Sequence, residues 1–124
     1  MKNFRDLKVW EKSHQLTLAC YEVTGGFPRQ ETYGLAAQIR RSSSSTPANI
    51  AEGCGRRGNG EFHRFLQIAM GSASELEYHL LLSKDLKFLS SLDHEQLHTQ
   101  VEEVKRMLAS LTRKVDAERS QSRG

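Results

Sequence analysis

The stretch from residue 33 to residue 57 limits the possible folds more than any other segment of the chain. Apolar and small residues recur in it every three or four positions, and this spacing places them on one face of a helix. That face consists of Ala36, Ile39, Ser43, Thr46, Ile50 and Gly53. Because all of them except the two isoleucines are small, neighbouring helices can approach closely. The stretch therefore predicts a helix inside a bundle.

A proline interrupts this predicted helix. Pro47 has no N–H to donate, and its ring clashes with the preceding turn, so we expect a kink there. Four serines, residues 42–45, come just before it and point to every side of the helix in turn. No strained turn exposes one of them as a nucleophile, so we interpret them as packing residues.

Three other segments show the same spacing with larger apolar residues. The first helix is expected to begin at Asn3 or Asp6 and to end before Gly25, the third to run from about residue 61 to 88, and the fourth to begin at Asp93. Their stripes are Val9, Ser13, Leu16, Cys20 and Val23; Phe62, Leu66, Ala69, Ala73, Leu76 and Leu80; and Leu97, Val101, Val104, Leu108, Leu111 and Val115. Long helices with short connections predict an all-α fold, an antiparallel up-down-up-down four-helix bundle over residues 1–117 with a frayed tail over 118–124.

Side chains at the expected helix starts supply candidate caps. Asn59, after a loop with four glycines, is expected to cap the third helix. Asp93 and Gln96 stand three apart before the last apolar stripe, which is a capping-box arrangement.

Length and cysteine content describe a single cytoplasmic domain. A chain of 124 residues can bury a sufficient core without disulfides or metals. Cys20 and Cys54 are far apart and form no Cys-x-x-Cys motif, so a reducing compartment is expected. The charged start of the chain does not resemble a signal peptide, and no apolar run reaches the roughly 18 residues of a membrane span.

Charge is distributed unevenly along the sequence. Residues 1–64 hold ten Lys and Arg against six Asp and Glu, whereas residues 65–124 hold eight against nine. A basic excess favours anionic partners, although an ordinary solvated surface would show the same modest bias. The candidate phosphate contacts are Arg40, Arg41, Arg56, Arg57 and Arg64.

Two motifs suggest other chemistry and are weaker. Residues 94–98 match the H-E-x-x-H pattern of zinc proteases, but they fall in the first turn of a helix with no strand to hold a substrate. The glycine-rich loop around Arg56 follows a helix and lacks the Gly-Lys-Ser/Thr ending of a nucleotide-binding loop. We therefore expect no metal, no cofactor, no small-molecule substrate and no enzymatic activity.

Polar residues beside the small-residue face indicate a structural network. Asn49 and Glu52 lie close to that face, and buried polar groups need partners. Arg41 lies about three turns before Glu52, and Glu75 of the third helix is a second candidate partner for it. We interpret Arg41, Asn49, Glu52 and Glu75 as a network that fixes the register of the bundle.

Several short segments together resemble one bacterial family. They are Tyr33-Gly34-Leu35, Gln38-Ile39-Arg40-Arg41, residues 47–53, Arg56, Leu7-Lys8-Val9-Trp10, Phe27-Pro28, Phe65-Leu66, Ala69, Gly71-Ser72 and Glu75-Leu76. The pattern is similar to that of the four-helix-bundle proteins called 23S rRNA-intervening-sequence proteins. The resemblance implies a ring-shaped homo-oligomer, typically a pentamer. It also implies, from the accessory proteins of diversity-generating retroelements in this family, a basic surface for RNA or DNA.

Two functions follow as expectations. The first is an oligomer that binds nucleic acid through the arginines. The second is a protein-interaction scaffold, in which the same arginines pair with carboxylates of a neighbouring subunit. Apolar residues that exceed the needs of one core are expected to face that subunit: Trp10, Leu18, Tyr21, Phe65, Leu81 and Leu82.

Overall fold

The computed structural model describes residues 2–123, and it is built from helices alone, with no strand in that range. Four α-helices span Lys8–Thr24 (α1), Leu35–Cys54 (α2), Gly58–Asp85 (α3) and Ser91–Arg123 (α4). Two short 3-10 helices, Phe4–Asp6 (η1) and Arg29–Glu31 (η2), precede α1 and α2. The prediction of an all-α, four-helix fold is confirmed.

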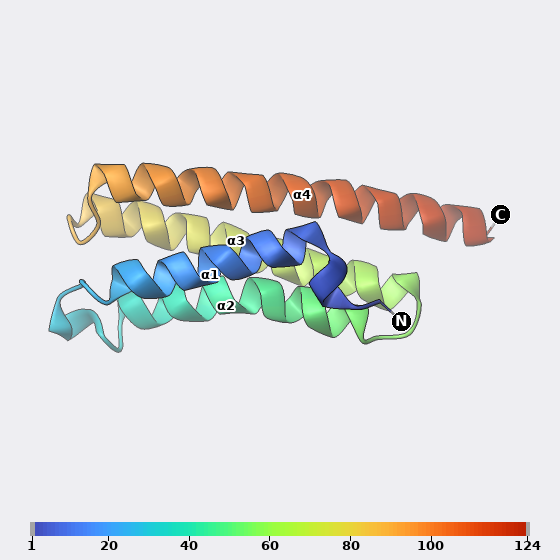
Figure 1. Ribbon diagram of the computed structural model, residues 1–124, viewed down its shortest axis with the longest axis horizontal. Helices are drawn as coiled ribbons and strands as arrows, with labels where there is room; N and C mark the ends of the chain where they lie inside the picture. The colour runs from blue at the N-terminus through green and yellow to red at the C-terminus, as the bar shows by residue number, and fades with distance from the viewer. Residues whose placement is uncertain (1, 124) are drawn as a thin grey trace.

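The four long helices lie side by side along the long axis of the molecule (Figure 1). The α1–α2 and α3–α4 connections lie at one end, and the α2–α3 connection lies at the other end with both chain termini. Helix α1 packs against α2 and α4, and α3 packs against the same two helices. Each helix therefore has two neighbours and one side that faces out.

The predicted stripes supply the core. Their central members are fully enclosed, as Leu66, Leu76, Val101 and Leu108 show at 0% exposure. Phe65 also belongs to the core, because only 5% of it is exposed. The expectation that Phe65 faces another subunit is therefore wrong, since the wide apolar stripe of α3 turns this ring toward the end of α2.

The small face of α2 permits the close contact with α3 that the sequence predicted. A Cβ atom added to Gly53 would lie 2.8 Å from the Cβ of Phe65 and 3.0 Å from a ring carbon of Phe62. Such distances leave no room for a side chain. More than two turns earlier in α2, the hydroxyls of Ser45 and Ser72 meet at 2.9 Å across the same interface.

Pro47 lies inside α2 and is buried. Because it has no N–H, the carbonyl of Ser43 one turn earlier lacks its helical donor. Thr17 of α1 supplies a replacement: its hydroxyl donates to the Ser43 carbonyl oxygen at 2.8 Å. The gap in the hydrogen-bond ladder is thus closed by a neighbouring helix, and the kink at Pro47 stays a prediction.

The helix starts differ from the predicted caps. Helix α3 begins at Gly58 without a side-chain cap, and Asn59 instead donates to Glu118 at 3.3 Å. Helix α4 begins at Ser91, where the hydroxyl of Ser90 accepts from the Asp93 amide at 3.0 Å. Both predicted caps are wrong because each helix starts two or three residues earlier than its predicted cap implies.

The last helix extends further along the chain than predicted. Residues 118–123 continue α4, and only Gly124 of the expected tail lies outside the described residues. Contacts with α3 account for this extension: Asp116 lies 3.1 Å from Nε2 of His63, and Glu118 accepts from Asn59. The boundary predicted at residue 117 therefore does not mark the end of the helix.

Candidate nucleic-acid interface

The five candidate arginines occupy three separate places in the fold. Arg40 joins α2 to the end of α1: its Nε donates to the Thr24 hydroxyl at 2.9 Å, and one Nη donates to the Tyr21 carbonyl at 3.2 Å. Its guanidinium carbon also lies 4.8 Å from the centre of the Tyr21 ring. Arg40 therefore anchors two helices in addition to any contact with a ligand.

Arg41 lies between α2 and α3. It forms an ion pair with Glu75 and donates to the Gln38 side chain at 2.9 Å. Both partners are accessible, since 56% of the Arg41 side chain and 37% of the Glu75 side chain are exposed. The ion pair thus joins the two helices at the surface, and the expected burial of Arg41 is not found.

The other two members of the expected polar network do not contact this pair. Asn49 donates to the carbonyl and hydroxyl oxygens of Ser45, at 2.8 and 3.0 Å, beside the contact of Ser45 with Ser72. Glu52 accepts from Arg56 at 2.9 Å. The structure therefore contains three small polar clusters along the α2–α3 interface instead of one network.

Arg56 and Arg64 come together at the α2–α3 connection. Their guanidinium carbons lie 5.2 and 4.6 Å from the centre of the Phe65 ring. Each is also paired with a glutamate, Arg56 with Glu52 at 2.9 Å and Arg64 with Glu61 at 3.1 Å. These ion pairs are exposed, so the arginines stay accessible to a phosphate that can compete for them.

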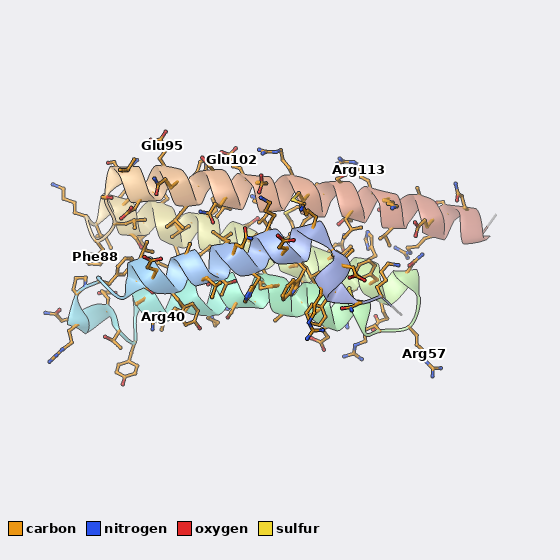
Figure 2. The ribbon with its side chains drawn as sticks, viewed as in Figure 1. Arg40, Arg57, Phe88, Glu95, Glu102 and Arg113 are labelled. Carbon is orange, nitrogen blue, oxygen red and sulfur yellow. The ribbon has the colours of Figure 1, made fainter. Side chains whose placement is uncertain are left out.

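Arg57 is the most available of the five. It precedes α3, is exposed, and forms no ion pair with a described carboxylate. The next residue, Gly58, has a φ of 78°, which favours glycine and turns the chain sharply into α3. Figure 2 shows the Arg57 side chain projecting away from the bundle at this connection.

The two ends of the bundle differ in net charge, and this difference is not visible when charge is counted along the sequence. Cross-helix contacts between Thr17 and Ser43, Ser45 and Ser72, and Lys105 and Glu77 mark the middle of the bundle. The half that contains the α2–α3 connection comprises residues 2–16, 45–71 and 107–121, and it carries ten Lys and Arg against six Asp and Glu. The opposite half, residues 17–44 and 72–106, carries seven against nine. We call the first half the basic end.

Sequence reasoning missed the contribution of α4 to the basic end. Arg113 and Lys114 are exposed and form no ion pair with a described carboxylate. They were overlooked because the acidic first half of α4 cancels them when charge is counted along the chain. Figure 2 places Arg57 and Arg113 toward the same end of the bundle and Arg40 toward the other. The signal was present in the sequence as a change of charge sign midway along the fourth helix.

The H-E-x-x-H segment does not assemble a metal site. His94 and His98 stack with ring centres 5.7 Å apart, and His98 contacts Glu102 at 3.0 Å. Glu95 projects outward from α4 (Figure 2). Within residues 2–123, no group of three or more His, Cys, Asp or Glu is arranged to hold a metal ion. Partial burial, together with nearby Lys84, lowers the pKa of His94.

The two cysteines are buried and free. Burial raises the pKa of Cys20 to about 12, although a hydrogen bond with Ser43 opposes the shift. Burial also raises the pKa of Cys54, against the opposing charge of Lys2. Neither thiol is prepared to act as a nucleophile, because the thiolate is the reactive form.

The remaining surface is partly apolar. Leu18, Tyr21 and Leu81 are exposed, and Trp10 and Leu82 are half-buried. These residues fall into two groups, Trp10, Leu18 and Tyr21 on α1 and Leu81 and Leu82 on α3. Along the described helices there is no segment both long enough and apolar enough to cross a membrane.

Comparison with known proteins agrees with the fold. The chain is similar to a crystal structure of a protein of unknown function from the S23 ribosomal protein family of Bacteroides thetaiotaomicron. The two share 26% identity with a TM-score of 0.76, over 84% of this chain and 97% of the other. Curated proteins give no match. The sequence profile of the 23S rRNA-intervening sequence proteins matches residues 5–110. The chain therefore belongs to the 23S rRNA-intervening sequence protein family.

Proposed function

We propose that this protein is a non-enzymatic, cytoplasmic homo-oligomer that binds the backbone of RNA or DNA through its basic end. The observation that carries the proposal is the separation of charge. Exposed cations from the N-terminal segment, the α2–α3 connection and the second half of α4 gather at one end of a bundle whose other half is slightly acidic. Such a field attracts a polyanion to one end and orients it there.

The cations of the basic end differ in how readily they can bind phosphate. Lys2, Arg5, Lys8, Arg57, Arg113 and Lys114 form no ion pair with a described carboxylate, whereas Lys12, Arg56, Arg64 and Arg119 do. A cation of the first group can bind a phosphate without first breaking an ion pair within the protein. The cations of the first group, Arg57, Arg113 and Lys114 among them, therefore supply the primary contacts, and Arg56 and Arg64 supply secondary ones.

Oligomerisation strengthens such binding. A single phosphate contact is weak, but several contacts on one strand multiply through effective concentration. We propose a closed ring of five subunits, which would repeat the basic end around one rim. The exposed apolar residues of α3, Ile68 and Leu81 among them, are available for contacts between subunits, because unpartnered apolar surface favours association.

Salt dependence tests the proposal. The protein, freed of cellular nucleic acid by nuclease treatment, would be titrated with labelled single-stranded RNA and duplex DNA at several salt concentrations. Micromolar or tighter binding is expected at 50 mM salt, with a log–log slope that counts the phosphate contacts. Absence of binding to every nucleic acid at 50 mM salt would overturn the proposal. Light scattering should return about five times the chain mass of 14.1 kDa.

One set of contacts favours a second candidate, a protein-interaction scaffold. Arg41, Arg56 and Arg64 already pair with carboxylates, so a neighbouring subunit can exchange partners with them without any nucleic acid. An oligomer that forms fully, with no affinity for RNA or DNA, would support this function instead.

A further inference from the structure

An apolar groove of about 470 Å³ lies between α1 and α2 on the outside of the bundle. Aromatic rings from η1 and α1 form one wall: Phe4, Trp10, His14 and Tyr21. The opposite wall is shaped by small residues of α2, among them Ala48 and Ala51. The groove is therefore bounded by aromatic rings on one side and by small side chains on the other.

The rings of the first wall are already stacked with one another. The Trp10 and His14 rings are nearly parallel, with an interplanar angle of 7° and centres 5.0 Å apart, and Phe4 lies 4.9 Å from Trp10. Tyr21 closes the far end of the groove and is 44% exposed. Trp10 and Tyr21 are eleven residues apart on one helix, about 16 Å at 1.5 Å per residue. That length matches about four or five bases stacked at 3.4 Å intervals.

Charge at the groove favours an anionic occupant. No acidic side chain lines it, since Glu11 and Glu22 of α1 lie outside the lining. A guanidinium stands at each end: Arg5 lies 4.5 Å from the centre of the Phe4 ring, and Arg40 lies 4.8 Å from the centre of the Tyr21 ring. Arg40 uses two of its five N–H donors within the protein, so others remain for a ligand.

We propose that this groove binds the bases of a single-stranded nucleic acid, which stack on its aromatic wall while Arg5 and Arg40 contact the flanking phosphates. The inference rests on the proposed nucleic-acid binding and adds the kind of strand recognised. The groove begins near Phe4 at the basic end, so a strand held there by its phosphates can continue into it. A duplex cannot, because its bases are already stacked inside the helix. Aromatic rings combined with cations are the usual means of holding a single strand without reading its sequence.

The only tryptophan of the chain, Trp10, reports directly on the groove. Wild-type protein at 50 mM salt would be titrated with a twelve-nucleotide thymidine strand, an abasic strand of the same length and charge, and a duplex. The thymidine strand should quench Trp10 fluorescence and bind about tenfold or more tightly than the abasic strand, because a base–aromatic stack contributes ~1–3 kcal/mol. Equal affinity for the base-bearing and abasic strands would overturn this inference and leave backbone binding intact. No binding of any strand would overturn the proposed function itself.

Variants of Tyr21 separate base stacking from other uses of the groove. Tyr21→Leu should weaken binding of the thymidine strand about tenfold and leave the abasic strand unaffected, whereas Tyr21→Phe should bind like the wild type because the ring is kept. Tyr78→Leu is the matched control, since Tyr78 is also exposed, at 59%, but lies on α3 outside the groove. If Tyr21→Leu lowers the oligomer mass and leaves the affinity for thymidine unchanged, the groove is a contact between subunits and the inference is overturned.

Discussion

Helices α2 and α4 use their residues in opposite ways. The core face of α2 is made of small and hydroxyl-bearing residues, and its arginines turn toward protein partners: Arg40 to the carbonyl of Tyr21, Arg41 to Glu75. The core face of α4 is made of larger aliphatic residues such as Val104 and Leu108, and Arg113 points to solvent. The two arginines of α2 therefore join helices to one another, whereas Arg113 of α4 is available to a ligand.

The contrast separates the segments that identify the family from the surface that is proposed to bind nucleic acid. Close approach to α3 restricts the positions of α2 that face it, because Gly53 has no room for a Cβ and Ser45 contacts Ser72. Helix α4 needs only an apolar stripe of the right period, so its outer face is free to carry charge. The segments of α2 that identify the family therefore describe how the bundle packs, and the proposed phosphate contacts lie largely elsewhere.

The largest effect is expected in the core of α2. Ile50 is fully buried, so Ile50→Ala should lower the free energy of unfolding by about 2–4 kcal/mol through lost burial and a residual cavity. Urea denaturation measures the change. Ala48→Ser, at an exposed position of the same helix, is the control and should cost less than about 0.5 kcal/mol. A loss below about 0.5 kcal/mol for Ile50→Ala as well would contradict the account of α2 as the packed helix.

The next effect concerns the surface of α4. Arg113→Gln together with Lys114→Gln should weaken nucleic-acid binding about tenfold at 50 mM salt and flatten the log–log salt slope by about two units, one for each lost contact. The matched control is Lys84→Gln with Lys87→Gln, which removes the same charge from the opposite end of the bundle. Similar losses from both pairs would mean that net charge, and not the basic end, governs binding.

Much of the fold could be predicted from the spacing of apolar residues. The stripes identified the helices and most of the buried side chains, because burial follows a period that is visible along the chain. Helix starts were less predictable: Ser90, and not Asp93, caps α4, and Asn59 contacts Glu118 instead of a backbone amide. Which side chain caps a helix depends on contacts with a neighbouring helix or on where the preceding turn ends. The spacing of apolar residues reports neither.

The candidate site was less predictable than the fold. Arg56 and Arg64 do converge over Phe65, as proximity in sequence suggested. Arg40, however, faces the end of α1, and the cations of α4 were hidden by the acidic residues that precede them. Charge acts through space, so a sum over half of the sequence does not report the field at one end of a bundle.

A smaller effect is expected at the hydrogen bond between Thr17 of α1 and Ser43 of α2. Thr17→Val removes the hydroxyl that donates to the Ser43 carbonyl, which Pro47 leaves without a helical donor. A buried acceptor without a partner costs about 1–3 kcal/mol, so we expect a loss of about 1 kcal/mol in the free energy of unfolding. In a Pro47→Ala background the restored amide serves that carbonyl, and the same substitution should then cost about half as much or less. Equal costs in the two backgrounds would show that Thr17 does not compensate for the proline.

The smallest effect is expected at Arg41, where a structural role of the arginine can be distinguished from phosphate binding. Its ion pair with Glu75 is exposed to solvent, and exposed pairs contribute only about 0.2–1 kcal/mol. Arg41→Ala should therefore lower the free energy of unfolding by about 0.5 kcal/mol. Because the guanidinium is held by Glu75 and Gln38, away from the basic end, the affinity for nucleic acid should stay within twofold of the wild type.

Glu75→Gln is the matched test: it releases Arg41 without removing its charge, and it should cost a similar amount of stability. If Arg41→Ala instead weakens binding as much as loss of Arg113 and Lys114 does, then Arg41 belongs to the phosphate surface, and its assignment to the packing of α2 against α3 is wrong.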